Sequence, residues 1–147
     1  MKLERGEFLE LVEYYKRAVL GIAWVCIGNL ALARQISLEV FQQFSASFVA
    51  LKKRENLSAW IGALTIGTCR RWNRRYVRVQ RDGEELGDLF LRLQRLPESN
   101  RFVLVLRYYA RMSYKEIGAF LDLPLNTVRG TMYKATQRWL LEFSKDF

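Results

Sequence analysis

The segment SYKEIGAFLDLPLNTVRGTMYKATQRW, residues 113–139, decides the fold of the C-terminal part of the chain. Ser113 and Glu116 have the spacing of a capping box, in which the serine caps a helix start and the glutamate side chain reaches back to it. A short apolar helix follows. The stretch DLPLN (122–126) then turns the chain into a longer helix, which Asn126 can cap. Two helices joined by so short a turn are typical of a helix-turn-helix.

The longer helix has one apolar stripe. Val128, Met132, Ala135 and Trp139 follow one another at intervals of four, three and four residues, which predicts a face turned towards a core. The other positions carry basic and small polar residues, with no acid before Glu142. Such a face suits the phosphate-lined major groove of DNA. The residues predicted to point outward are Thr127, Arg129, Gly130, Tyr133, Lys134, Gln137 and Arg138.

Helical spacing of apolar residues continues upstream. It predicts a first helix that ends at Gly28-Asn29. It predicts a second helix that Asn29 can cap and that Ile36, Val40, Phe41, Phe44 and Phe48 carry towards Leu51, and a third helix from about Ser58. The third helix ends in a run with six arginines between residues 70 and 81. Further along, Pro97 is placed to start a helix, and FVLVLRYY (102–109) is predicted to be a buried one.

Charge divides the chain into parts. Residues 1–81 carry a formal charge of +8, residues 82–96 carry −2, and residues 97–147 carry +3. The acidic, glycine-bearing stretch DGEELGD (82–88) is typical of a linker. The sequence therefore predicts an all-α fold of two small helical domains, 1–81 and 89–147, joined by a short acidic linker, with the helix-turn-helix in the second domain.

Composition narrows the function. The net charge of +9 and the pI of about 9.9 favour a polyanionic partner, either nucleic acid or an anionic membrane surface. Histidine is absent, which removes the commonest general base and metal ligand, and Cys26 and Cys69 alone cannot make a tetrahedral zinc site. We expect no catalytic residues, metal or cofactor. No apolar run reaches the roughly 18 residues of a membrane span, so a cytoplasmic protein with reduced cysteines is expected.

A series of motif residues then points to one family: Leu96-Pro97, Arg101, Leu106-Arg107, Ser113-Tyr114, Glu116-Ile117, Thr127-Val128 and Ala135. In their order and spacing, residues 93–140 resemble region 4 of the extracytoplasmic-function (ECF) sigma factors of the sigma-70 family. The N-terminal part resembles region 2 of that family through fewer features. These are its amphipathic first helix, Glu39-Val40-Phe41, Trp60 and the arginine-rich helix end.

The resemblance implies a two-domain, all-helical initiation factor. Its first domain would dock on the coiled-coil clamp of RNA polymerase core and open the −10 element of double-stranded promoter DNA. Its second domain would read the −35 element and touch the polymerase flap, and an anti-sigma factor is a further partner that the family implies.

Three groups of residues are predicted to make these contacts. Residues expected at a −35-like element are Asn126, Thr127, Arg129, Gly130, Thr131, Tyr133, Lys134 and Arg138. Residues expected at a −10-like element are Lys52, Lys53, Arg54, Arg70, Arg71, Arg74 and Arg75. Residues expected at the polymerase are Arg34, Gln35, Leu38, Glu39 and Gln42. Simple alternatives stay open, namely helix capping for Asn126, core packing for Trp60 and Trp72, and a solvated arginine face.

The chain also departs from the family pattern. In LARQISLE (32–39), Leu32 and Gln35 replace two usual aspartates and an arginine enters at position 34, which reduces charge complementarity with a basic clamp. In the last helix the usual Lys-Ser-Arg becomes Arg-Gly-Thr (129–131). The predicted linker, 82–88, spans at most about 25 Å when extended. Promoter elements about 17 base pairs apart lie about 58 Å apart along the DNA axis.

These departures leave two other functions open. One is a diverged sigma-like regulator, or a decoy for an anti-sigma factor, without full polymerase engagement. The other is a basic protein-interaction or membrane-surface module that uses the arginine-rich helix. Gly130 bears on the choice. We expect it to let the helix backbone lie close to the groove floor, whereas a degenerate DNA-binding helix could carry a glycine there through drift.

Overall fold

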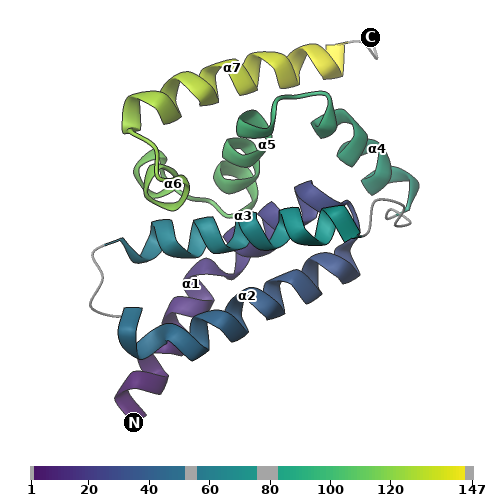
Figure 1. Ribbon diagram of the computed structural model, residues 1–147. Coiled ribbons are helices and arrows are strands. Elements are labelled where there is room, and N and C mark those ends of the chain that lie inside the picture. The colour runs from purple at the N-terminus through teal and green to yellow at the C-terminus, as the bar shows by residue number, and fades with distance from the viewer. Residues whose placement is uncertain (1, 52–55, 76–82, 145–147) are drawn as a thin grey trace.

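The computed structural model describes residues 2–51, 56–75 and 83–144, and these residues form helices joined by short turns (Figure 1). The predicted all-α class is therefore confirmed. No helix within these ranges combines the length and the hydropathy of a membrane span. The elements are α1 (Lys2–Ile27), α2 (Leu30–Leu51), α3 (Leu57–Arg75), α4 (Glu84–Gln94), α5 (Glu98–Leu104), the π-helical turn η1 (Val105–Tyr109), α6 (Tyr114–Leu121) and α7 (Leu125–Ser144).

The junction between α1 and α2 forms as the sequence predicts. Gly28 adopts a φ of 70°, a left-handed conformation that glycine reaches without steric cost, and its N–H donates to the Trp24 carbonyl at 2.8 Å. Asn29 then caps α2, because its Oδ1 accepts a hydrogen bond from the Leu32 N–H at 3.0 Å. These local interactions reverse the chain and lay α2 beside α1 (Figure 1).

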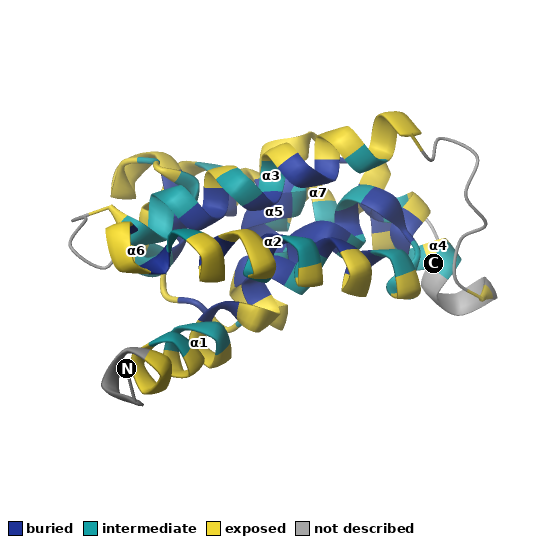
Figure 2. Cartoon of the chain, turned by 60° about the horizontal axis from the view of Figure 1, so that its bottom comes forward, coloured by how far each residue is buried: buried dark blue, intermediate teal, exposed yellow. Residues whose placement is uncertain are grey.

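Each long helix buries one stripe of side chains and exposes the other side (Figure 2). The stripe of α2 recurs every three or four residues, as an amphipathic helix requires. It consists of Ala33, Ile36, Val40, Phe44, Phe48 and Leu51. Trp60 of α3 is half-buried against this stripe, with its ring centroid 6.1 Å from that of Phe44, which agrees with a core role for this tryptophan.

The predicted buried helix over 102–109 is only partly correct. Phe102 and Leu106 are buried, but the last turn is a π-helix in which the Ala110 N–H donates to the Val105 carbonyl at 3.1 Å. A π-turn inserts an extra residue and so rotates the following side chains relative to the core. As a result, Tyr108 is 67% exposed, although the apolar run predicted that it would be buried.

The predicted linker also needs correction. Gly83 stands at the N-cap of α4, so residues 84–88 are helical instead of extended. The physical reason lies further along the same helix. Phe90 is buried, with its ring centroid 5.9 Å from that of Trp24, and Gln94 Nε2 donates to the Val25 carbonyl at 2.8 Å. These contacts hold α4 on α1, and residues 76–82 lie outside the described ranges.

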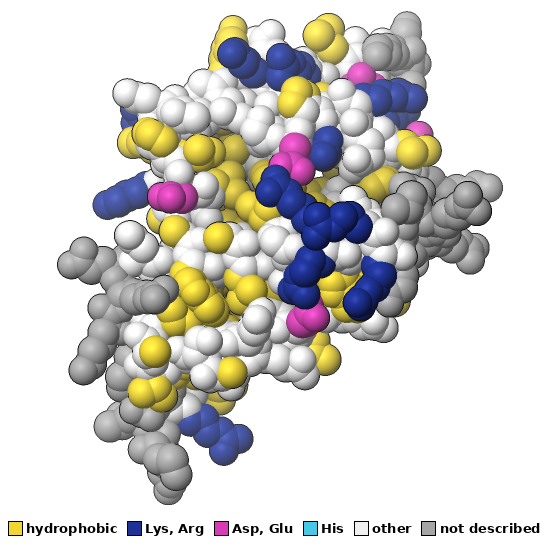
Figure 3. Space-filling view, viewed as in Figure 1, with side chains coloured by type: hydrophobic (Ala, Val, Ile, Leu, Met, Phe, Trp, Pro, Cys, Tyr) yellow, Lys and Arg dark blue, Asp and Glu magenta, His cyan; other side chains and the backbone are white. Residues whose placement is uncertain are grey.

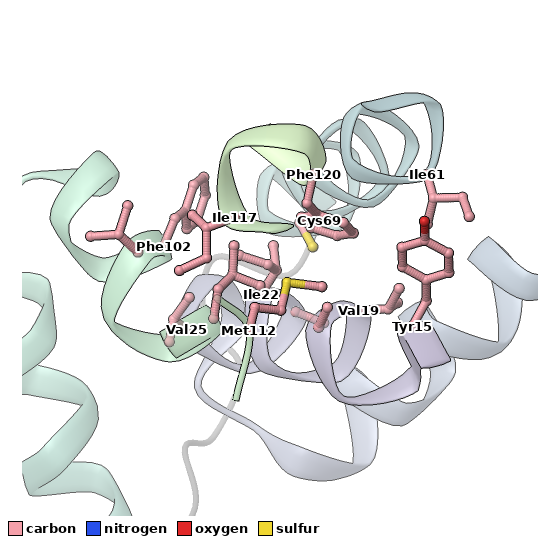
Figure 4. Close-up of a cluster of buried hydrophobic side chains, with 14 of the residues drawn as sticks. Tyr15, Val19, Ile22, Val25, Ile61, Cys69, Phe102, Met112, Ile117 and Phe120 are labelled. Carbon is pink, nitrogen blue, oxygen red and sulfur yellow. The ribbon is translucent and has the colours of Figure 1, made fainter. Parts of the chain in front are cut away.

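The two predicted domains share one apolar core in this structure. Figure 4 shows Tyr15 of α1, Ile61 of α3, and Ile117 and Phe120 of α6 within one cluster of buried hydrophobic side chains. The rings of Tyr15 and Phe120 stack with centroids 6.1 Å apart. The division of the chain at 82–88 stays a prediction, and the structure places α1 and α3 directly against η1 and α6.

Glycine allows the closest of these approaches. A Cβ atom at Gly62 of α3 would overlap the backbone carbonyl oxygen of Phe120 in α6. A Cβ at Gly21 of α1 would lie 2.9 Å from Val105 Cγ2. At these points the backbone of one helix lies directly against the neighbouring element, which is possible only because glycine carries no side chain. Any larger residue would push the two halves of the molecule apart.

Candidate nucleic-acid interface

The capping box predicted from Ser113 and Glu116 is present. The Ser113 N–H donates to Glu116 Oε1 at 3.0 Å, and the Glu116 N–H donates to Ser113 Oγ at 3.1 Å. The Tyr14 hydroxyl of α1 donates to Glu116 Oε2 as well. These hydrogen bonds, first that from Tyr14 and then those from Ser113, lower the pKa of Glu116. The start of α6 is therefore tied both to its own first turn and to α1.

The turn between α6 and α7 is closed by backbone geometry. Asp122 takes a left-handed conformation with a φ of 56°, and the Leu123 N–H donates to the Gly118 carbonyl at 2.8 Å. The chain re-enters a helix early, because the Val128 N–H already donates to the Pro124 carbonyl. The prediction that Asn126 caps α7 is therefore wrong. Asn126 lies inside the first turn of a helix that begins at residue 125.

The long helix α7 packs as its sequence predicts. Val128, Met132 and Ala135 are buried and Trp139 is half-buried, so the stripe at intervals of four, three and four residues is the face towards α5 and α6. Figure 2 shows the opposite side of the helix exposed along most of its length. Seven of the eight residues predicted for the −35-like element are exposed, and Thr131 is half-buried.

Two of these positions have specific surroundings. No atom lies within 4 Å of where a Cβ at Gly130 would be, so the surface over this glycine is open. Arg138 lies at the edge of the face, where its Nη1 donates to Oδ1 of the buried Asn100 at 2.8 Å. The exposed face centred on Arg129, Gly130, Tyr133 and Lys134 is therefore open to a partner, whereas Arg138 has a partner within the chain.

The arginines at the end of α3 form a second basic region. Figure 3 shows a cluster of Lys and Arg side chains on the surface over α3. Arg70 Nη2 donates to Glu98 Oε1 of α5 at 2.9 Å, and Arg71 pairs with Glu39 of α2 at 3.6 Å. Arg74 and Arg75 are exposed at the helix end. Because these ion pairs are exposed, each contributes at most about 1 kcal/mol, and the guanidinium groups can exchange partners. Lys52, Lys53 and Arg54 lie outside the described residues.

The predicted polymerase surface lies on one side of α2. Arg34, Gln35, Leu38 and Gln42 are exposed within two turns of each other, and Leu38 is 60% exposed. Glu39 is half-buried because its carboxylate accepts a hydrogen bond from Trp72 Nε1 at 3.1 Å and faces Arg71. The one acid of this group is thus partly neutralised by α3, and Trp72 packs at the core edge instead of standing free to stack on a base.

Sequence reasoning missed an apolar groove between α1, α4, η1 and α7. It has a volume of about 690 Å³, and its walls are almost wholly apolar. Trp24, Leu93, Val105, Tyr109 and Leu140 are among its lining residues. These residues come from four elements that are far apart in the chain, so no local sequence pattern predicts the groove. The exposed π-turn and the apolar end of α7 form parts of its wall.

Other polar contacts hold this side of the molecule together. Glu142 is buried, its Oε2 accepts from Arg95 Nη1 at 3.1 Å, and its carbonyl accepts from Arg92 Nη1 at 3.2 Å. Within α1 and α3, a hydrogen bond with the Cys26 thiol and burial raise the pKa of Cys69, which keeps this thiol protonated. Among the described residues no three His, Cys, Asp or Glu side chains come together as a possible metal ligand set.

Comparisons with known proteins agree with this architecture. The family described as Sigma-70, region 4 matches residues 86–138, which include α5, η1, α6 and most of α7. The ECF RNA polymerase sigma factor SigW of Bacillus subtilis (strain 168) is 22% identical over 165 aligned positions, covering 92% of this chain and 88% of that protein.

Two solved structures share the whole fold. CnrH in complex with the cytosolic domain of CnrY superposes with a TM-score of 0.72 at 22% identity, covering 97% of this chain and 91% of CnrH. The sigma factor RpoE of Bartonella quintana, in complex with the anti-sigma factor NepR, gives a TM-score of 0.68 at 16% identity, covering 96% and 99%. Residues 86–138 thus match region 4 of the sigma-70 family, and the chain as a whole is similar to an ECF sigma factor along nearly its entire length.

Proposed function

We propose that the chain is a sigma factor that joins RNA polymerase core to promoter DNA. The observation that carries the proposal is the exposed basic face of α7 in a helix-turn-helix that matches Sigma-70, region 4. The alignment with SigW, a protein named as an RNA polymerase sigma factor, supports the polymerase partner. The activity is one of binding and strand opening, not of catalysis.

In this function α7 enters the major groove of a −35-like element. Arg129 and Lys134 contact phosphates or guanine edges, which accept hydrogen bonds from basic side chains. Asn126 and Thr127 lie in the first turn of α7, where free backbone N–H groups favour phosphate oxygens. Gly130 leaves room for the helix backbone to approach the groove, because nothing occupies the space over it.

The N-terminal half supplies the other two contacts. The exposed arginines of α3 neutralise phosphates near a −10-like element. The exposed side of α2, with Arg34, Gln35, Leu38 and Gln42, docks on the polymerase clamp. This surface is poor in acid, so its affinity for a basic partner depends more on apolar and hydrogen-bonding contacts than on charge attraction.

An anti-sigma factor is a third partner in the proposal. The similar RpoE was solved with the anti-sigma factor NepR, and CnrH was solved with the cytosolic domain of CnrY. In this chain, the groove between α1, α4, η1 and α7 offers an apolar surface that spans both halves of the molecule. A partner seated there would contact both halves and hold them together.

One observation favours the second candidate, a sigma-like regulator without full polymerase engagement. The apolar core that α1 and α3 share with α6 ties the two halves together, and separating them exposes buried aromatic side chains. A chain that stays in this form cannot span two promoter elements about 58 Å apart. Such a chain would act by binding DNA or an anti-sigma factor alone.

Reconstitution with RNA polymerase core tests the proposal. We expect the protein to co-elute with core polymerase and to direct transcription from discrete promoters on genomic DNA. Retained DNA binding without co-elution would leave only the regulator. Absence of both would favour a protein-interaction or membrane-surface module.

A further inference from the structure

The basic regions of α3 and α7 meet at the first turn of α5. Arg70 of α3 donates to Glu98, and Arg138 of α7 donates to Asn100, at 2.9 and 2.8 Å respectively. Glu98 and Asn100 are two residues apart in that turn, so two arginines from opposite halves of the chain bind the same short stretch of α5. Figure 3 shows Lys and Arg side chains over α3 and, above it, over α7 on one face of the molecule.

Helical periodicity extends this surface on both sides. In α3, Arg70 and Arg74 are one turn apart, and in α7, Lys134 and Arg138 are one turn apart, so each pair lies on one side of its helix. All four side chains are exposed. With the exposed Arg71 they form what we call the cationic surface, in which Glu98 and Glu39 are the acids paired with its arginines.

The packing between the halves fixes the geometry of this surface. Gly62 of α3 lies against the backbone of Phe120, and Gly21 of α1 lies against Val105, so α1 and α3 cannot move relative to η1 and α6 without loss of these contacts. A compact chain of 147 residues has a diameter of about 40 Å. That length corresponds to about 12 base pairs of duplex DNA, well short of two elements about 58 Å apart.

We infer that the chain, without polymerase, binds one short segment of duplex DNA independently of sequence, with α3 and α7 contacting the same segment through the cationic surface. The inference rests on the proposed DNA-binding function but adds a mode that needs neither polymerase nor a promoter. Phosphate oxygens replace Glu98 and Asn100 as acceptors for Arg70 and Arg138. The bound segment releases counterions in proportion to the cations that contact it.

The test measures binding of fluorescently labelled duplexes of about 14 and 30 base pairs without promoter sequence, over a range of salt concentrations. Five contacting cations predict that log Kobs falls with log salt with a slope of about −4.5, equal for both lengths. Arg74→Ala and Lys134→Ala each reduce the slope by about 0.9 on the shorter duplex. Arg5→Ala, at the end of α1 furthest from α7, leaves the slope unchanged (Figure 1).

A second variant pair tests whether the halves must stay together. Gly62→Ala separates α3 from α6, and the slope on the shorter duplex weakens from about −4.5 to about −2.7, the value for the three α3 arginines of the cationic surface alone. Gly67→Ala in the same helix is the control, because nothing lies within 4 Å of its Cβ position. Circular dichroism checks that both variants stay helical.

Three results would overturn the inference. One is a Lys134→Ala effect that is seen on the longer duplex alone. Another is a slope for Gly62→Ala equal to that of the unaltered chain. The third is binding to phosphatidylserine vesicles with no binding to DNA, which would assign the surface to a membrane. Promoter-specific transcription with core polymerase is scored separately. If the chain fails that assay but binds the short duplex, the sigma function is refuted, whereas the sequence-independent binding of a short duplex is not.

Discussion

Gly130 is the residue at which stability and DNA binding are expected to oppose each other. A glycine in an exposed helix interior costs roughly 0.5–1 kcal/mol relative to alanine, and nothing in the free protein blocks a Cβ there. We expect Gly130→Ala to raise the free energy of unfolding by that amount, measured by urea denaturation, and to weaken DNA binding because the methyl group meets the groove. Gly67→Ala should give the stability gain alone. Unchanged DNA affinity in Gly130→Ala would instead indicate drift in a helix that no longer reads DNA closely.

Glu116 makes a pH-dependent link between α1 and α6. Its pKa is lowered by hydrogen bonds, so its charged form stabilises the fold above the ordinary value of about 4.3, and this stabilisation is lost as pH falls through the folded pKa. We expect Glu116→Gln to be less stable than the unaltered chain at pH 7, by less than about 1 kcal/mol because solvent screens the site. The difference should shrink as the pH falls from about 5 through the range in which Glu116 becomes protonated. Urea denaturation across this range measures it, and a difference that grows on acidification would contradict the assignment.

At the scale of elements, α7 is predicted to be the helix that reads DNA. Arg129→Ala and Lys134→Ala should each weaken promoter binding by about 1–3 kcal/mol if they contact bases, and should reduce the salt slope by about 1 if they contact phosphates. Both side chains are exposed, so the free energy of unfolding should stay within about 0.5 kcal/mol. Unchanged promoter affinity in the double variant would remove α7 from the DNA interface.

The elements also show how far local sequence predicts local structure. The capping box at Ser113 and the Asn29 cap form as predicted because each depends on residues three positions apart. Asn126 fails as a cap because Pro124 and the closed turn before it start α7 earlier. Tyr108 is exposed because a π-turn, which no apolar pattern marks, shifts the register of the helix.

At the scale of the whole molecule, the contact between Gly62 and Phe120 decides whether the two halves stay together. Gly62→Ala places a methyl group against backbone, which cannot move aside as a flexible side chain can. We expect it to lower the free energy of unfolding by about 1–3 kcal/mol, the usual cost of overpacking, and to raise the radius of gyration in small-angle scattering. Gly67→Ala in the same helix should do neither. A variant as compact and as stable as the Gly67 control would show that α6 adapts without separation.

The sequence by itself determined most of the helices, the caps at Asn29 and Ser113, the amphipathic stripe of α7 and the helix-turn-helix, because these depend on residues within one or two turns of each other. Only the tertiary structure decided that α3 lies against α6, that Arg70 and Arg138 both hydrogen-bond to α5, and that an apolar groove opens beside Trp24. These features join side chains far apart in the chain. Their contacts follow from how the apolar faces pack against each other, and no local periodicity encodes that choice.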